Sequence, residues 1–301
     1  MRITFKKGIG IAFDVLVIAV FLRLIISPDL VSVPVTKSLY LCLRVIVPTL
    51  FVYMVLAKII ISMPFTDLIA GSGRYGIEAE VLLLGLLCGF PVGANSAVYL
   101  YEKGIISKKR AEYICAFTNN ASLSFMLGYI GMAVFGDIRT GIRLAAFQLF
   151  SSVLLAIVLR FTYMDKSDFT RINKSSRINR KRISLAEAVS ASAMTMISVC
   201  ALIVVFSVLG ELALYTLRFK GFYKVLVKGF FEFATGCAMA TELELYAKSA
   251  VVSIIIGFSG LCVIMQVISV IRGKLSARMY IAGRFFNAAV IGLLSLVFGT
   301  T

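Results

Sequence analysis

Apolar runs of about 20 residues, separated by short polar stretches, recur along the whole 301-residue chain. A helix of about that length spans the hydrocarbon core of a bilayer. The chain is 60% hydrophobic and 15% charged, with a mean hydropathy of +0.96, whereas soluble domains hold about 45–50% apolar and about 25% charged residues. The sequence therefore predicts an all-α polytopic membrane protein. It excludes a soluble enzyme, a disordered chain and a secreted disulfide scaffold.

Two of the apolar runs are interrupted near their centres. Residues 80–101 hold two Gly and a Pro within five residues, and residues 221–244 have short arms around Glu232. Gly and Pro break helices, and an arm of about ten residues is half the length of a membrane span. We therefore predict that both runs are re-entrant hairpins. The other runs are predicted to cross the membrane: 8–26, 39–62, 111–136, 142–163, 185–210, 249–271 and 281–298.

The distribution of Lys and Arg favours this arrangement. With both hairpins re-entrant, the segments on the side of the N-terminus hold eighteen Lys and Arg residues, seven of them in the loop 164–184, and the opposite segments hold five. If every run crossed, that basic loop would lie opposite the N-terminus, against the rule that positive loops stay in the cytoplasm. We therefore predict that the N-terminus and the loop 164–184 are cytoplasmic and that the C-terminus lies on the other face.

The same scheme predicts an internal repeat. Residues 39–163 and 185–298 both give the order span, re-entrant hairpin, broken span and span, but they start from opposite faces. Inverted-topology repeats with a midplane site are typical of secondary transporters. The predicted parts are an N-terminal transmembrane helix with an outer loop (1–38), a first half-repeat (39–163), a basic cytoplasmic loop (164–184) and a second, inverted half-repeat (185–301).

Charge, histidine and cysteine content exclude several function classes. The net charge of +16 indicates loops that contact anionic lipid headgroups, and no nucleic-acid binding is expected because no aromatic residues interleave with the charges. The chain has no His, which removes His-ligated metals and His-based catalysis. Its six Cys lie in apolar runs without a CxxC pair. We expect no cofactor, no metal centre and no disulfide.

Polar and helix-breaking residues inside the first half-repeat are candidates for contact with a solute. The hairpin centre GFPVGAN could present backbone N–H groups to a solute, or it could be a plain helix break. The pair Asn119–Asn120 lies deep in an apolar run, where amides need partners, so it binds a solute or bonds to neighbouring helices. The candidates in this half are Gly89, Pro91, Gly93, Asn95, Asn119, Asn120 and Ser122.

The second half-repeat offers a carboxylate. Glu232 lies in a Phe-rich stretch, and an apolar setting favours the neutral acid, so this group could exchange a proton or bind a cation. Alternatively, it pairs with Lys224 or Lys228. Arg284 and Asn287 in the last span could contact an anionic solute or lipid phosphates. The candidates in this half are Glu232, Thr235, Gly236, Ser259, Gly260 and Gln266.

Four motifs in order resemble a known family: VPTLF (47–51), GFPVGAN (89–95), FTNNAS (117–122) and GFSG (257–260), followed by Gln266. Over roughly residues 39–298 the chain resembles the YlbJ-type sporulation integral membrane proteins of the nucleoside-recognition (Gate) domain group. That group is similar to parts of the concentrative nucleoside transporters. The resemblance implies a bacterial sporulation role and passage of a small solute, with dipicolinate as the candidate, across the mother-cell-derived forespore membrane. Family members often carry Lys at the position of Asn95, and its absence argues against a cationic anion site at the hairpin. They often carry Pro at the position of Leu123, and its absence predicts a less sharp helix break after Asn120.

These observations together predict a secondary transporter or permease that moves a small anionic solute by alternating access at a midplane site. Its location would be the bacterial cell membrane or the outer forespore membrane. Two alternatives are a nucleoside-type solute transporter and a non-transporting scaffold that uses the basic loop to dock other sporulation membrane proteins. An intramembrane enzyme is not expected, since the chain has no His, no GxSxG motif and no paired catalytic carboxylates. The oligomeric state stays open.

Overall fold

In the computed structural model, residues 2–63, 75–169 and 182–298 are described, and every regular element among them is a helix. Most of the loop 164–184, to which the docking surface was assigned, lies outside the described residues. Five helical stretches in the described part are long and apolar enough to cross a membrane: Asp29–Ser62, Ile138–Thr162, Leu185–Leu217, Leu245–Ile271 and Arg278–Phe298. The prediction of an all-α membrane protein is confirmed.

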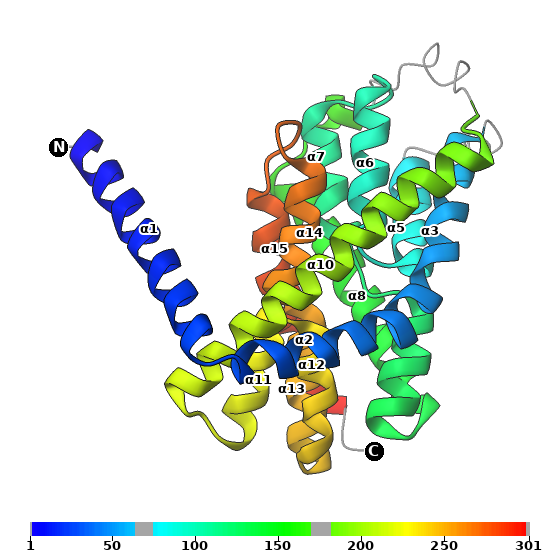
Figure 1. The fold of residues 1–301 in the computed structure, drawn as a ribbon. Helices are drawn as coiled ribbons and strands as arrows, with labels where there is room; N and C mark the ends of the chain where they lie inside the picture. Colours follow the sequence, from blue (N-terminus) through cyan, green and yellow to red (C-terminus); the bar gives the residue numbers. More distant parts are fainter. Residues whose placement is uncertain (1, 64–74, 170–181, 299–301) are drawn as a thin grey trace.

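The first part of the chain begins with α1 (Arg2–Ile26), which stands apart from the other helices in Figure 1. The next helical stretch is formed by α2 (Asp29–Leu41), a π-helical turn (Cys42–Ile46) and α3 (Val47–Ser62). The segment 27–38 was predicted as an outer loop, and this is wrong from Asp29 onward. Pro28 precedes the first turn of α2 and Asp29 lies in that turn, a combination that starts helices.

Pro48 lies within this long helical stretch without ending it. The N–H of Val47 bonds to the carbonyl of Cys42, five residues back, so the helix widens by one residue just before the proline. Pro48 then occupies the first turn of α3, where a missing N–H costs little. The sequence between residues 29 and 62 therefore forms one membrane-length stretch with a local change of pitch.

The remaining elements of the first half are shorter. Two antiparallel helices, α5 (Gly76–Cys88) and α6 (Val92–Glu102), are joined by a turn in which Gly89 has φ +77°. An interrupted helix follows, made of α7 (Lys108–Thr118) and the π-helix η2 (Phe125–Phe135). It breaks at Asn119, whose backbone is extended, so the lack of Pro at Leu123 does not soften the break. The half ends with α8 (Ile138–Thr162) and a short 3₁₀ turn, η3 (Lys166–Phe169).

The second half has the same order of elements. A long helix, α10 (Leu185–Leu217), extends beyond the predicted end at residue 210. The short helices α11 (Gly221–Phe231) and α12 (Phe233–Met239) meet at Glu232, and a 3₁₀ turn, η4 (Ala240–Glu242), follows. The interrupted helix consists of α13 (Leu245–Phe258) and α14 (Gly260–Ile271), which are separated by Ser259 in the left-handed region. The last helix is α15 (Arg278–Phe298).

The arrangement of these elements places the two hairpins at opposite ends of the molecule. In Figure 1, α5 and α6 lie in the upper half, whereas α11 and α12 lie in the lower half. The long stretches α2–α3 and α10 run across the molecule and contact each other along both α2 and α3. The α14–α15 turn lies at the upper end and the last turn of α15 at the lower end. The breaks and hairpin tips therefore fall between the two ends.

Close packing of the first hairpin generates a stability prediction. A Cβ atom at Gly93 would lie 2.5 Å from the carbonyl oxygen of Thr118 at the end of α7, so Gly93→Ala must push backbone apart. We expect a loss of about 1–3 kcal/mol and a lower thermal midpoint in detergent. Gly128→Ala is the control, because a Cβ atom there meets nothing within 4 Å. Equal midpoints for the two variants, measured by size-exclusion chromatography after heating, would contradict this packing.

Candidate functional site

The tips of the two hairpins touch through aromatic side chains. The rings of Phe90 at the first tip and Phe233 at the second lie 5.9 Å apart, edge to face, and Phe125 of η2 lies 5.0 Å from Phe233. All three side chains are buried. The hydroxyl of Tyr129 donates to the carbonyl of Ala234 at 3.2 Å, which ties η2 to the second hairpin. Residues more than 140 positions apart in the sequence thus form one apolar contact.

The first helix break is bonded to the first hairpin tip through Asn119. Its side-chain oxygen accepts a hydrogen bond from the N–H of Ala94 in the first turn of α6, at 2.9 Å, and its nitrogen donates to the carbonyl of Cys115 at 2.8 Å. A Cβ atom on Gly89 would meet Ser122 at 3.0 Å, so the tip lies directly against the break. One buried amide therefore satisfies an orphan N–H of one helix and a carbonyl of another.

The other polar groups of the first break are satisfied by α8. The side chain of Gln148 accepts from the N–H of Ala121 at 3.1 Å and donates to its carbonyl at 3.0 Å. Ser152 donates to the side-chain oxygen of Asn120 at 2.9 Å. These side chains are at most 3% exposed. In this structure, the side chains of Asn119 and Asn120 therefore form hydrogen bonds to neighbouring helices, which is one of the two roles considered for the pair.

The second tip is organised by Glu232, which is fully buried. Its carboxylate oxygens accept from the N–H groups of Ala234 at 3.0 Å and Thr235 at 2.6 Å, so it caps the first turn of α12. An ion pair between Glu232 and Lys228 was one alternative, and this is wrong. Lys228 instead donates to Glu211 at 3.0 Å and to the carbonyl of Ser207 at 2.9 Å. Lys224 contacts Glu242 at 3.8 Å.

The second break is held by α15, as the first is held by α8. Arg284 donates to the hydroxyl of Ser259 at 3.2 Å and to the carbonyl of Ala116, near the end of α7, at 3.4 Å. Its side chain is 1% exposed, and no carboxylate of the described residues forms an ion pair with it. A Cβ atom on Gly260 would lie 3.0 Å from the carbonyl of Gly229 and 3.1 Å from the nitrogen of Phe233. Arg284 thus bridges the C-terminal ends of α7 and α13, where a positive charge is favourable.

A small cavity lies at the centre, where the tips, the breaks and the long helices converge. Its volume is about 20 Å³, which is room for about one water molecule. Among the predicted site residues, Ser122 and Gln266 line it, together with the ring of Phe90 and that of Phe233. The amide nitrogen of Gln266 donates to the sulfur of Cys262 at 3.3 Å, and no other hydrogen bond from this amide is found among the described residues. The centre is therefore closed to any solute in this arrangement.

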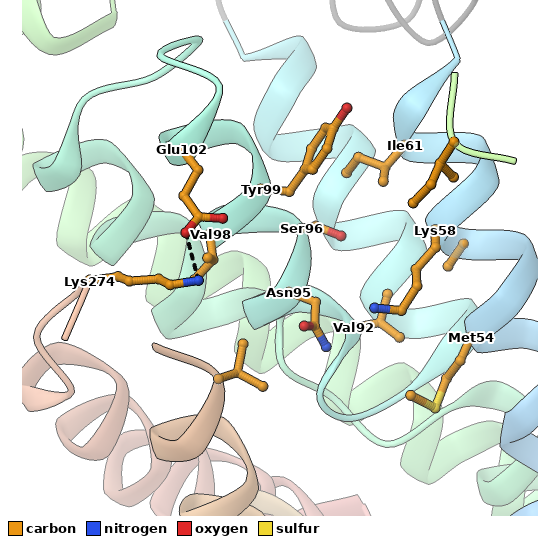
Figure 2. Close-up of a pocket in the computed structure, with 13 residues that line it drawn as sticks. Met54, Lys58, Ile61, Val92, Asn95, Ser96, Val98, Tyr99, Glu102 and Lys274 are labelled. Atoms are coloured by element: carbon orange, nitrogen blue, oxygen red, sulfur yellow. Dashed lines mark ion pairs between the residues drawn. The ribbon is translucent and has the colours of Figure 1, made fainter. Parts of the chain in front are cut away.

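Two larger cavities flank the closed centre. The first, of about 230 Å³, follows α6 from Val92 near the tip to Glu102 at the far end, and it contains Asn95 (Figure 2). The second, of about 650 Å³, follows α12 and η4 from Thr235 to Glu242 and is also lined by α2, α10 and η2. Each hairpin thus has a cavity along its second arm. Gly89, Gly93, Gly236 and Gly260 form close backbone contacts instead of lining either one.

Sequence reasoning missed the aromatic contact and the bonds from Gln148. A signal for the first was present: both tips carry Phe, two residues and Gly, as Phe90-Pro-Val-Gly93 and Phe233-Ala-Thr-Gly236. The shared spacing marks the ring that meets its counterpart and the glycine that packs against a neighbouring backbone. Gln148 had no comparable signal, since a single Gln in an apolar run does not reveal which backbone it faces.

These features define the class of the protein: an all-helical integral membrane protein with interrupted helices and two short hairpins. It is similar to the sporulation integral membrane protein YlbJ of Bacillus subtilis (strain 168), with 25% identity over 233 residues that cover 65% of this chain and 57% of the relative. The chain thus matches little more than half of the length of that relative. No family model and no solved structure matches the chain. The comparison confirms the resemblance found from the four motifs.

The bonds at the first break generate a second stability prediction. Gln148→Leu leaves the buried N–H and carbonyl of Ala121 without these partners, at a cost of about 1–3 kcal/mol. We expect a clearly lower thermal midpoint. Gln266→Leu is the matched control, because among the described residues the same change there removes a weak hydrogen bond to sulfur and no bond to backbone. A midpoint of Gln148→Leu as high as that of Gln266→Leu would show that Gln148 does not hold the break.

Proposed function

We propose that this protein is a secondary transporter that moves a small anionic solute across a bacterial membrane by alternating access. The observation that carries the proposal is the closed contact between the two hairpin tips, with a cavity along the second arm of each hairpin. A solute that enters one cavity must pass the tips to reach the other. Binding at the midplane between half-helices is the usual arrangement in secondary transporters.

The proposal includes an inverted repeat with two re-entrant hairpins. Support comes from the common order of a long helix, a hairpin, an interrupted helix and a final helix in residues 29–162 and 185–298. The hairpin helices have 13, 11, 11 and 7 residues. At a rise of about 1.5 Å per residue, each is at most about 20 Å long, whereas the hydrocarbon core is about 30 Å thick. The hairpins therefore suit entry from one face and return to it.

The orientation and the solute are the finer parts of the proposal. The bias of Lys and Arg places the N-terminus and the loop 164–184 in the cytoplasm. The name of the similar protein, a sporulation integral membrane protein, supports a role in spore formation. Dipicolinate is the first solute to test, because the family resemblance implies it, and nucleosides are the second.

The test is uptake by proteoliposomes that contain the purified chain. A panel of dipicolinate, other small carboxylates and nucleosides is presented outside, and the solute trapped inside is measured against empty liposomes. We expect saturable uptake of an anion. If the protein takes up nucleosides and no anion, the transported solute is a nucleoside and the anionic part of the proposal is wrong. If correctly folded protein takes up none of these compounds, the transport proposal fails and the scaffold function is the alternative that stands.

Glu232 provides a prediction within that assay. Gln keeps an oxygen that accepts from α12 but cannot ionise, so Glu232→Gln should retain the fold. If the buried carboxylate takes part in coupling, this variant loses the pH dependence of uptake or most of its rate. Glu244→Gln is the control, since Glu244 is exposed at the start of α13 and caps nothing. Normal uptake by Glu232→Gln at every pH would make Glu232 a helix cap only.

A further inference from the structure

The cavity along α6 has a mixed lining that suits a small amphipathic ligand. It is formed by α3, α6 and α14, and its volume of about 230 Å³ is below the range of about 300–1,000 Å³ that is usual for drug-sized ligands. Most of its wall is apolar, with Met54, Ala57 and Ile61 from α3 facing Val92 and Val98 from α6. Residues three and four apart share one face of a helix, which explains why Met54 and Lys58 point to the same space.

Two lysines face this cavity, and they differ in whether a nearby carboxylate neutralises their charge (Figure 2). Lys274 lies at the rim and is paired with Glu102 at 2.6 Å. Lys58 is half-buried. Among the described residues, it forms neither an ion pair with a carboxylate nor a side-chain hydrogen bond. Its ammonium group and the amide of Asn95 both point into the space between α3 and α6.

A half-buried ammonium group without a counter-charge is costly, and the cost falls when an anion binds to it. Asn95 donates one hydrogen bond, to the carbonyl of Pro91 at 3.2 Å, and its NH₂ group has a second hydrogen to donate. Among the residues that the structure describes, the cavity therefore offers a positive charge without a counter-charge, an amide donor and an apolar wall within the same space. This combination matches a carboxylate with an apolar body.

We propose that the cavity between α3, α6 and α14 binds a small carboxylate, with Lys58 as its counter-charge and Asn95 as a hydrogen-bond donor. This inference rests on the proposed transport function and names the place where the solute first binds on the side of α6. Lys58 is then the residue that selects an anion over a neutral molecule of the same shape. Lys274 does not share this role, because Glu102 neutralises it.

The test is binding to the full chain in nanodiscs of phosphatidylcholine, with benzoate as the probe and benzamide as its neutral counterpart. We expect calorimetry to detect benzoate and not benzamide. Lys58→Gln should weaken benzoate binding about tenfold or more, the usual effect of losing a charged hydrogen-bond partner. Lys108→Gln is the control, since Lys108 is exposed at the start of α7 outside the cavity. Equal affinity for benzoate in Lys58→Gln and the parent would overturn the proposal.

A second variant distinguishes loss of the binding site from a general destabilisation of the protein by Lys58→Gln. The double variant Lys58→Asn with Asn95→Lys places the ammonium group on α6 and the amide on α3, so it should regain benzoate binding that Lys58→Asn alone has lost. Failure of the double variant to bind, while it folds like the parent, would also overturn the proposal.

Two further arms distinguish a solute site from a lipid site, and binding from transport. Lipid phosphates are a second source of negative charge, so the assay is repeated with added phosphatidylglycerol. If Lys58 affects only the binding of that lipid and never that of benzoate, the site is a lipid site and the proposal fails. Uptake is measured in parallel. Uptake with no dependence on Lys58 overturns the inference and leaves transport standing, whereas Lys58-dependent binding without uptake supports the site and overturns transport.

Discussion

A helix that stops inside a bilayer must find partners for its last carbonyls and first N–H groups, because the hydrocarbon offers none. Among the residues that the structure describes, helices are interrupted at the two hairpin tips and at the two breaks, and buried side chains satisfy groups at each of these places. Asn119 serves the first tip and the first break together, Gln148 serves the first break from α8, and Glu232 caps α12. Arg284 bonds the second break to the end of α7.

This constraint explains why the centre is a compact block. Asn119, Gln148 and Arg284 each bond to the backbone of another element, so these segments meet their hydrogen-bond needs only when they lie against one another. Glu232 instead caps the helix that directly follows it. Glycine makes that approach possible at Gly93 and Gly260, where any side chain would meet neighbouring backbone. The closure of the central cavity to about 20 Å³ and the two larger cavities beside it then result from the same packing. In the proposed transport cycle, these contacts must break before a solute can pass.

Much of the framework could be predicted from the sequence because its signals are local. Gly89 and Pro91 in one apolar run, and Glu232 in another, mark short hairpin arms, and Asn119 and Ser259 mark breaks. Signals that depend on distant residues were not available. Lys228 was close to Glu232 in sequence but pairs with Glu211, seventeen residues away on α10. The start of α2 was missed because residues 29–38 are less apolar than the run that follows, although Pro28 and Asp29 signal a helix start.

The contact between Phe90 and Phe233 is the most direct place to test the account, which holds that the tips must separate for a solute to pass. Both residues are replaced by Cys in a chain without its six native cysteines, and a short bifunctional methanethiosulfonate joins them in proteoliposomes. The account predicts cross-linking of the double variant alone, loss of uptake when the tips are joined, and recovery when a reductant removes the link. Efficient cross-linking with unchanged uptake, or no cross-linking in a folded and active double variant, would contradict it.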